Sequence, residues 1–260
     1  MPYTLSHVAV VLPFARALAR ARLLSAAVIG SMVPDFGYLM PLHPARAATH
    51  SAWSLLTFSL PVGLATYWVF QYLIKPPLIT VLPDAAFLRW RPWSKPAALT
   101  DPRQWLLAAC GVLAGAITHL VWDGFTHEGA RGLRMVPELD DWGIVVHGHY
   151  MTGANVLQGW SSVLGLAFVL AGVLYALRDG APQGPVPVRP LGPAARSTWM
   201  LAYLMAAVLF TFGFDLHDPI SHLPFPGVQI LVAAVALLRG LALSLVAVSL
   251  ALTLYLRVPR

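Results

Sequence analysis

A histidine and an aspartate four residues apart, His119 and Asp123, form the most specific chemical signal in the sequence. Residues at this spacing share one face of a helix. A neutral imidazole and a carboxylate on one face can bind a single divalent ion. His127 continues the face if the helix persists past Gly124. The competing interpretation is structural, because the same pair can form an interhelical hydrogen bond that holds a helical bundle together.

Two further fragments and one N-terminal histidine can complete a metal site around this pair. Asp35 follows one apolar segment, and His50 precedes the next. A bridging carboxylate would allow two ions, which suit hydrolysis because one activates water while the other stabilises the leaving oxygen. The alternative for Asp35 and for residues 49–51 is helix capping, and for His7 an ordinary interfacial position. The candidate set contains four imidazoles and two carboxylates: His7, Asp35, His50, His119, Asp123 and His127.

The segments that carry these residues resemble a known family. They are residues 5–7 (LSH), 30–35 (GSMVPD), 49–51 (THS) and 118–127 (THLVWDGFTH). They look like an uncharacterised bacterial membrane family of unknown function, which is similar to the membrane-bound metal-dependent hydrolases. More distantly, the family is similar to zinc-dependent phospholipase C and its related single-strand nucleases, which also carry an HxxxD helix. The resemblance covers residues 1–177 and implies that the six candidate residues are metal ligands.

One stretch departs from the pattern of that family. A Gln-His pair is expected before the two serines of the following helix, but residues 157–162 read LQGWSS. Either His147 or His149 replaces the missing histidine, or the site is altered.

The favoured function is therefore a metal-dependent hydrolase with zinc as the expected ion. A nearby carboxylate such as Glu128 is the candidate general base, and a phosphoester in or near lipid is the expected substrate class. Two other classes stay open. A metal or small-solute transporter predicts ionisable residues deep within several helices. A non-catalytic membrane scaffold predicts that alanine at His119 lowers stability without removing a metal.

The composition places these residues in a membrane protein. Hydrophobic residues make up 58% of the chain, charged residues only 11%, and the mean hydropathy is +0.68. A soluble domain carries about a quarter charged residues, so a lipid-facing surface explains the deficit. The net charge is +6, but the lysines and arginines lie between apolar runs, which favours membrane topology over nucleic-acid binding. The single cysteine, Cys110, excludes an intramolecular disulfide.

The apolar runs predict an all-α bundle with five to seven membrane helices in one domain, residues 1–260. Within it we expect a family-like core (1–177), a cytoplasmic linker (178–197) and C-terminal membrane helices (198–260). Residues 5–33 predict a hairpin of two short helices. The last run contains Arg239, which predicts a tilt, a break near Gly240 or an interfacial start. The five long runs are residues 53–74, 104–122, 160–177, 198–214 and 228–256.

Loop charges predict the orientation of the chain in the cytoplasmic membrane. The basic loops 75–103 and 178–197 and the C-terminus should be cytoplasmic. The acidic loop 123–159 and the loop 215–227, which lacks Lys and Arg, should face outward. All nine histidines then fall on the outer side, where the site would meet membrane lipid. A second polar cluster on this side is read as a solvated loop, and it comprises Asp215, His217, Asp218 and His222.

Overall fold

The computed structural model describes residues 3–40, 44–97, 99–146, 149–178, 191–217 and 226–257. It is 83% helical, which confirms the all-α class. The chain divides into two compact units: Met1–Tyr67 with Leu99–Arg178, and Trp68–Ala98 with Asp179–Arg260. Residues 75–98, predicted to belong to the family-like core, therefore group with the C-terminal helices.

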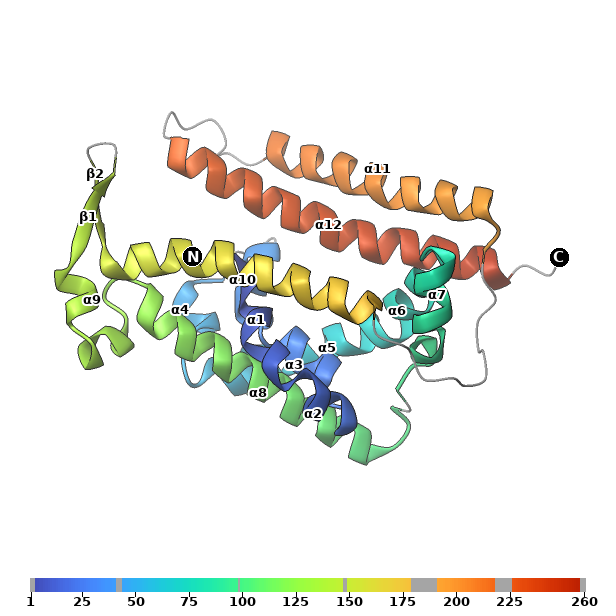
Figure 1. The fold of residues 1–260 in the computed structure, drawn as a ribbon, viewed down its shortest axis with the longest axis horizontal. Helices are drawn as coiled ribbons and strands as arrows, with labels where there is room; N and C mark the ends of the chain where they lie inside the picture. The colour runs from blue at the N-terminus through green and yellow to red at the C-terminus, as the bar shows by residue number, and fades with distance from the viewer. Residues whose placement is uncertain are drawn as a thin grey trace. The chain divides into compact units, whose positions relative to one another are not determined.

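The first unit consists of short N-terminal helices packed on two long ones (Figure 1). The N-terminal hairpin has a segmented first arm, because Pro13 interrupts the α-helix with a 3-10 turn, and Arg22 turns the chain with a φ of 61°. The short helices are η1 (Thr4–His7), α1 (Val8–Val11), η2 (Leu12–Phe14), α2 (Ala15–Arg20), α3 (Leu24–Gly30), η3 (Val33–Leu39), α4 (Arg46–Thr49), the π-helical η4 (Leu55–Ser59) and α5 (Leu60–Val69). The long helices are α8 (Pro102–Thr126) and α10 (Gly153–Arg178).

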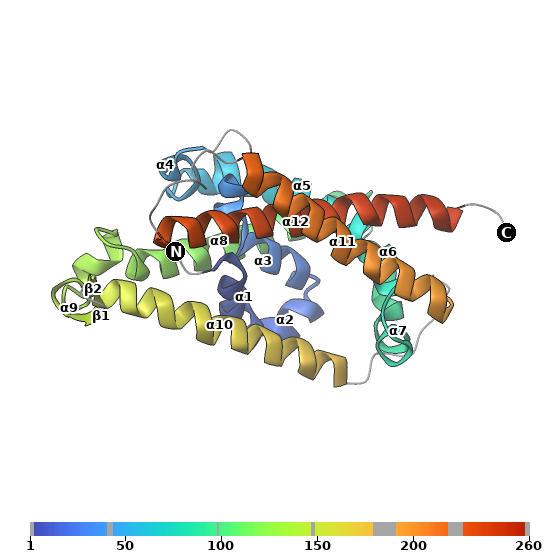
Figure 2. The same cartoon turned by 90° about the horizontal axis from the view of Figure 1, so that it is seen from above.

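Helices α3 and α8 approach each other at backbone distance. A Cβ added to Gly115 would lie 2.1 Å from the carbonyl oxygen of Ala27, and one added to Gly30 would lie 2.2 Å from that of Val112. Only glycine permits so close an approach. The contact places Ser31, directly after α3, beside His119, one turn beyond Gly115. Helix α1 and segment η1 contact both α8 and α10, which positions the N-terminal residues against the same helix (Figure 2).

The segment between α8 and α10 contains a β-hairpin that the sequence analysis did not predict. Strands β1 (Gly143–Val146) and β2 (His149–Thr152) pair antiparallel, with Val145 opposite Tyr150. The valine-rich and aromatic composition favours this conformation. Before it lie η7 (Arg131–Met135) and α9 (Glu138–Asp141). Helix α10 begins at Gly153, well before the apolar run that predicted it.

The second unit is built on two long antiparallel helices that lie side by side, α11 (Pro193–His217) and α12 (Pro226–Arg257) (Figure 1). The hydroxyls of Tyr203 and Ser249 lie 2.8 Å apart, and Ser244 donates to the Tyr203 carbonyl at 2.6 Å. Helix α12 continues through the buried Arg239 and Gly240, so the predicted break is wrong. The other elements are the π-helical η5 (Phe70–Ile74), α6 (Lys75–Thr80), α7 (Asp84–Trp90) and η6 (Arg91–Ser94).

Four helices among the described residues are long and apolar enough to cross a bilayer. They are Pro102–Thr126, Gly153–Ala176, Pro193–Gly213 and Val232–Arg257, and they indicate a multi-pass membrane protein. Their exposed leucines, such as Leu106, Leu164 and Leu209, suit contact with lipid rather than water. The predicted run 53–74 is divided into π- and α-helical segments and is not among the four. The expected count of five to seven is therefore not confirmed by the described residues. Of the predicted linker, residues 179–190 lie outside the described chain, and residues 193–197 are helical.

Candidate metal centre

Five of the six predicted ligands converge in the first unit, on four different elements. His7 ends η1, Asp35 lies in η3, His50 follows α4, and His119 and Asp123 lie one turn apart on α8. His7 and Asp35 are each 2% exposed, His119 is fully buried and Asp123 is 5% exposed. The His50 side chain is also 5% exposed. So many buried polar groups require partners inside the protein, because burial removes the water molecules that would otherwise bind them.

The ligand atoms of four of these residues form four close pairs. His50 Nε2 lies 3.3 Å from Asp35 Oδ1 and 3.5 Å from Asp123 Oδ2. His119 Nε2 lies 3.6 Å from Asp35 Oδ1 and 3.5 Å from Asp123 Oδ2. Tetrahedral zinc with bonds of about 2.0–2.1 Å separates its ligand atoms by about 3.3–3.4 Å. The four distances are close to this value, and Asp35, His50 and His119 form one group whose ligand atoms lie within 4.8 Å of one another.

Hydrogen bonds outside this set fix which atoms face its centre. His119 Nδ1 lies 2.8 Å from the Ser31 carbonyl, which only accepts, so Nδ1 carries the proton and Nε2 presents a lone pair. His50 Nδ1 lies 2.7 Å from the Thr49 hydroxyl, which donates to the Arg46 carbonyl. Thr4 donates to Asp35 Oδ2 at 2.8 Å and leaves Oδ1 for the centre. Partners of this kind orient metal ligands in proteins.

His7 adds a possible second position. Its ring stacks on His119 with centroids 3.7 Å apart, and its Nε2 lies 3.5 Å from Asp123 Oδ1. Neither ring nitrogen of His7 has a hydrogen-bond partner, and the same holds for His119 Nε2 and Asp123 Oδ1. Unpaired buried polar atoms are uncommon. Asp123 thus turns one oxygen toward each of two neighbouring groups, His7–His119–Asp123 and Asp35–His50–His119.

The protonation states of His7 and Asp35, which lie outside the spanning helices, favour the binding of a cation. Burial, followed by repulsion from His119, lowers the pKa of His7 to about 4, so this ring is neutral near pH 7. Burial alone raises the pKa of Asp35, but contacts with His50, His119 and His7 outweigh it and hold the pKa below its ordinary value. Neutral imidazoles and ionised carboxylates are the forms that bind metals. Arg46 Nη2 contacts Asp123 Oδ2 at 2.6 Å and supplies one positive charge against two carboxylates.

His127 lies at the margin of the cluster. Helix α8 ends at Thr126 and His127 is extended, so the helical face does not continue as predicted. His127 Nδ1 still lies 3.6 Å from Asp123 Oδ1, but also 3.1 Å from the Asp123 carbonyl. Its Nε2 lies 3.4 Å from Gln158 Nε2. His127 is therefore not in either three-residue group, and the glutamine beside its ring, Gln158, belongs to the stretch in which the expected histidine is missing.

A cavity of about 640 Å³ adjoins the cluster. Glu128, the predicted base, lines it, and its Oε1 accepts from Asn155 at 2.7 Å and from Thr152 at 3.3 Å. The lining combines charged, aromatic and aliphatic side chains, among them Arg46, His50, Trp53, Leu120, Asp123, His127, Glu128 and Arg131.

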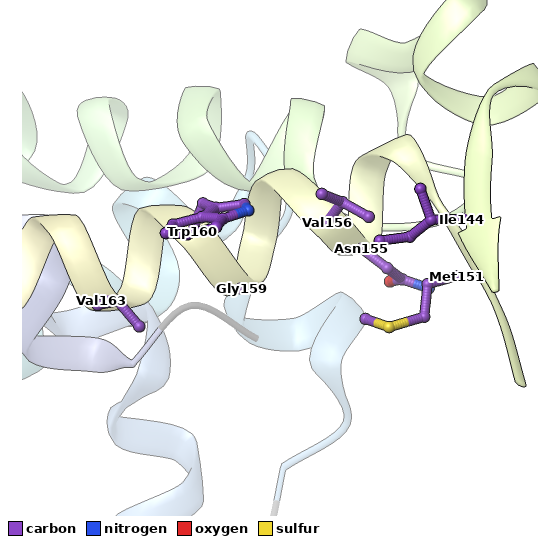
Figure 3. A pocket seen from close by; sticks show the side chains of 7 residues that line it. All are labelled: Ile144, Met151, Asn155, Val156, Gly159, Trp160 and Val163. Carbon is purple, nitrogen blue, oxygen red and sulfur yellow. The ribbon is translucent and has the colours of Figure 1, made fainter. Parts of the chain in front are cut away.

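A second depression, beside the β-hairpin, has a different character. It measures about 320 Å³ and lies where β1 and β2 meet the first turns of α10 (Figure 3). Its lining is mainly apolar and includes Ile144, Met151, Val156 and Trp160. None of the six candidate ligands lines it.

A family model described as a domain of unknown function, DUF4184, matches residues 1–250. The chain belongs to this family. The DUF4184 match extends past residue 177, where the resemblance was expected to end, and includes most of both C-terminal helices. No curated protein and no solved structure matches this DUF4184 chain.

One residue of this DUF4184 site, Arg46, was not predicted from the sequence. Several other residues named in the prediction lie outside the part of the chain that the structure describes, or are described only in their backbone. Arg46 lies four residues before His50, a spacing that places both on one helical face, but it was not among the predicted residues. His43, His147, Asp218 and His222 lie outside the described residues. His149, Asp215 and His217 are described only in their backbone. Neither proposed substitute for the missing histidine is therefore tested.

The contact between Thr49 and His50 gives a prediction for this DUF4184 chain. Thr49→Val removes the hydroxyl that accepts from His50 Nδ1, so the ring loses its fixed orientation. Zinc affinity should fall about tenfold to a hundredfold, as measured by competition with a chromophoric chelator. Thr57→Val is the matched control, because this exposed hydroxyl bonds only its own helix, at the Trp53 carbonyl. Equal affinity in both variants would contradict the prediction.

Proposed function

We propose that this chain is a membrane-embedded, metal-dependent hydrolase that acts on a phosphoester in or near lipid. One observation carries the proposal: His50 Nε2 and His119 Nε2 each lie 3.3–3.6 Å from a buried oxygen of Asp35 and one of Asp123, and hydrogen bonds behind the rings turn both nitrogens toward these oxygens. The loop charges of the sequence favour a site at the outer face of the cytoplasmic membrane, with the C-terminus in the cytoplasm.

Each residue has a role under this proposal. Asp35, His50 and His119, with Asp123 beside them, would hold one divalent cation, with zinc expected, and His7 with Asp123 would hold another where two ions bind. A cation bound there supplies a Lewis acid that activates water and polarises an ester oxygen. Glu128 accepts the proton of the attacking water, and the amide of Asn155 holds its carboxylate at the cavity wall. His127 steadies the Asp123 end of α8.

The cavity lining supports an amphiphilic substrate. Leu120 lies on the spanning helix α8, and Trp53, at the rim, is 71% exposed. An exposed indole next to an apolar helix is typical of the membrane–water interface. A lipid-like molecule can therefore place its apolar part against Leu120 and Trp53 while its polar end reaches Asp123.

Turnover by the purified, zinc-reconstituted protein tests the proposal on a panel of carboxylic esters, phosphomonoesters and phosphodiesters. We expect metal-dependent hydrolysis of phosphoesters that is abolished by chelation. Glu128→Gln should lower kcat about a hundredfold to ten-thousandfold with the metal retained. Glu138→Gln, an exposed change in α9, is the control. A metal-loaded parent with no turnover on the panel would remove the hydrolase assignment.

The transporter alternative is distinguished by a separate measurement. In the described residues the buried ligands lie toward one end of α8, and Arg239 in α12 is the buried ionisable residue of another spanning helix. Zinc uptake into sealed proteoliposomes would favour a transporter. Loss of stability in His119→Ala, in a parent that binds no metal, would favour a scaffold.

A further inference from the structure

We propose that Arg46 is the anion-binding residue of the cavity and that the cavity receives a phosphate oxyanion there. The inference rests on the proposed metal centre and specifies the polar end of its substrate. The family resemblance did not include Arg46. The oxyanion can belong to a lipid headgroup or to a free phosphate, and the two sources are separated by experiment below.

The position of Arg46 places one guanidinium between the metal ligands and the cavity. Arg46 begins α4, one turn before His50. Its Nη2 contacts Asp123 Oδ2, but the Arg46 side chain is 38% exposed whereas that of Asp123 is 5% exposed. The guanidinium thus extends from the buried cluster to the accessible wall. It has five N–H donors in a planar fork, and contacts with Asp123 and Tyr38 leave some of them for a ligand.

The charges of the cavity favour an anion once a cation is bound. Without one, Arg46 compensates part of the charge of Asp35 and Asp123. A divalent cation would neutralise both carboxylates, so the positive charge of Arg46 would then face a cavity in which Glu128 is the one remaining carboxylate of the described lining. The exposed Arg131 lines the same cavity and adds a second positive charge, while Glu128 is held by Asn155 and Thr152.

Arginine is chemically suited to this role. Its fork binds two oxygens of a phosphate at once, whereas lysine offers a point charge. Binding of cation and anion should also be reciprocal, so that each raises the affinity of the other by the same factor. The cavity therefore combines a charged wall for phosphate with Trp53 and Leu120 for an apolar group.

The test measures inorganic phosphate binding to the full-length protein in detergent by calorimetry, with zinc content determined on each preparation. Arg46→Gln should weaken phosphate binding about tenfold or more, because charge-assisted hydrogen bonds are lost. Arg46→Lys should retain zinc and fall between parent and Arg46→Gln. Arg134→Gln, an exposed change in η7 outside the cavity lining, should bind as the parent does.

The outcomes separate this inference from the proposed function. A zinc-loaded parent whose phosphate affinity is unchanged by both Arg46 substitutions overturns the inference and leaves the metal centre intact. A parent without zinc overturns the proposed function, and Arg46 is then tested by phosphate binding to the metal-free protein, where no binding or no effect of Arg46→Gln overturns the inference. If Arg46→Gln loses zinc, the phosphate affinity of the zinc-retaining Arg46→Lys variant is compared with that of the parent instead.

A competition experiment identifies the source of the oxyanion. Mixed micelles containing phosphatidic acid should displace inorganic phosphate more effectively than glycerol phosphate does if a lipid headgroup is bound. Equal displacement by both indicates a free phosphate. Displacement by neither, from a protein that binds phosphate through Arg46, contradicts phosphoester recognition and overturns the inference.

Discussion

Asp123→Ala is expected to abolish metal binding by this protein. The two oxygens of Asp123 lie near His7, His50 and His119, so its removal changes both three-residue groups of the candidate centre. The substitution also leaves Arg46 without its carboxylate partner. Elemental analysis of detergent-purified protein should show stoichiometric zinc in the parent and none in the variant. Asp140→Ala, an exposed aspartate in α9, is the control.

The thermal stability of the same two proteins gives a second measurement. A cation that binds only the folded state stabilises it by an amount that grows with the logarithm of its concentration divided by its Kd, and the unfolding temperature rises accordingly. Chelation should therefore lower the Tm of the parent but leave that of Asp123→Ala unchanged. A correctly folded Asp123→Ala protein that retains zinc would show that Asp123 is not a ligand.

Gly115→Ala is expected to have the largest effect on folding. The added Cβ would lie 2.1 Å from the Ala27 carbonyl, a backbone atom that cannot move without separating α3 from α8. Overpacking costs about 1–3 kcal/mol, and a backbone clash should lie at the upper end of this range. Separation of the helices also weakens the bond between His119 and Ser31. The unfolding temperature and the zinc content should both fall.

Gly159→Ala is the matched control for this substitution. It makes the same chemical change in the neighbouring long helix α10, where an added Cβ has no heavy atom within 4 Å. Alanine is favoured over glycine in a helix interior by about 0.5–1 kcal/mol, so stability should be unchanged or slightly higher. Equal destabilisation by the two substitutions would contradict the assigned α3–α8 contact.

Those parts of the structure that depend on long apolar runs could be predicted from the sequence. Helices α8, α10, α11 and α12 coincide with four of the five predicted runs, because a continuous apolar segment is what a bilayer requires. The run at 53–74 was apolar enough, but hydropathy carries no information about the π-helical segments that divide it. The β-hairpin was missed because its two strands are only four residues each.

The candidate site was predictable to a different extent at each residue. His119 and Asp123 follow from helical spacing alone. His7, Asp35 and His50 lie on short helices without periodicity, and their convergence depends on how η1, η3 and α4 pack against α8, so motif resemblance was needed to find them. Arg46 was not predicted. The sequence does not distinguish an arginine that bonds a metal ligand from one that only helps to set the orientation of the chain in the membrane.

The glycine contact between α3 and α8 sets the rotation of α8 about its own axis, and therefore the direction in which the candidate ligands on α8 point. Each residue of an α-helix turns the chain by about 100°, and Gly115 fixes which side of α8 faces α3. One alanine inserted between Gly115 and His119 would rotate both ligands of α8 away from Asp35 and His50 while the helix stays apolar and intact. The protein should therefore tolerate substitutions on the lipid face of α8. It should not tolerate insertions or deletions within the single turn that separates Gly115 from His119.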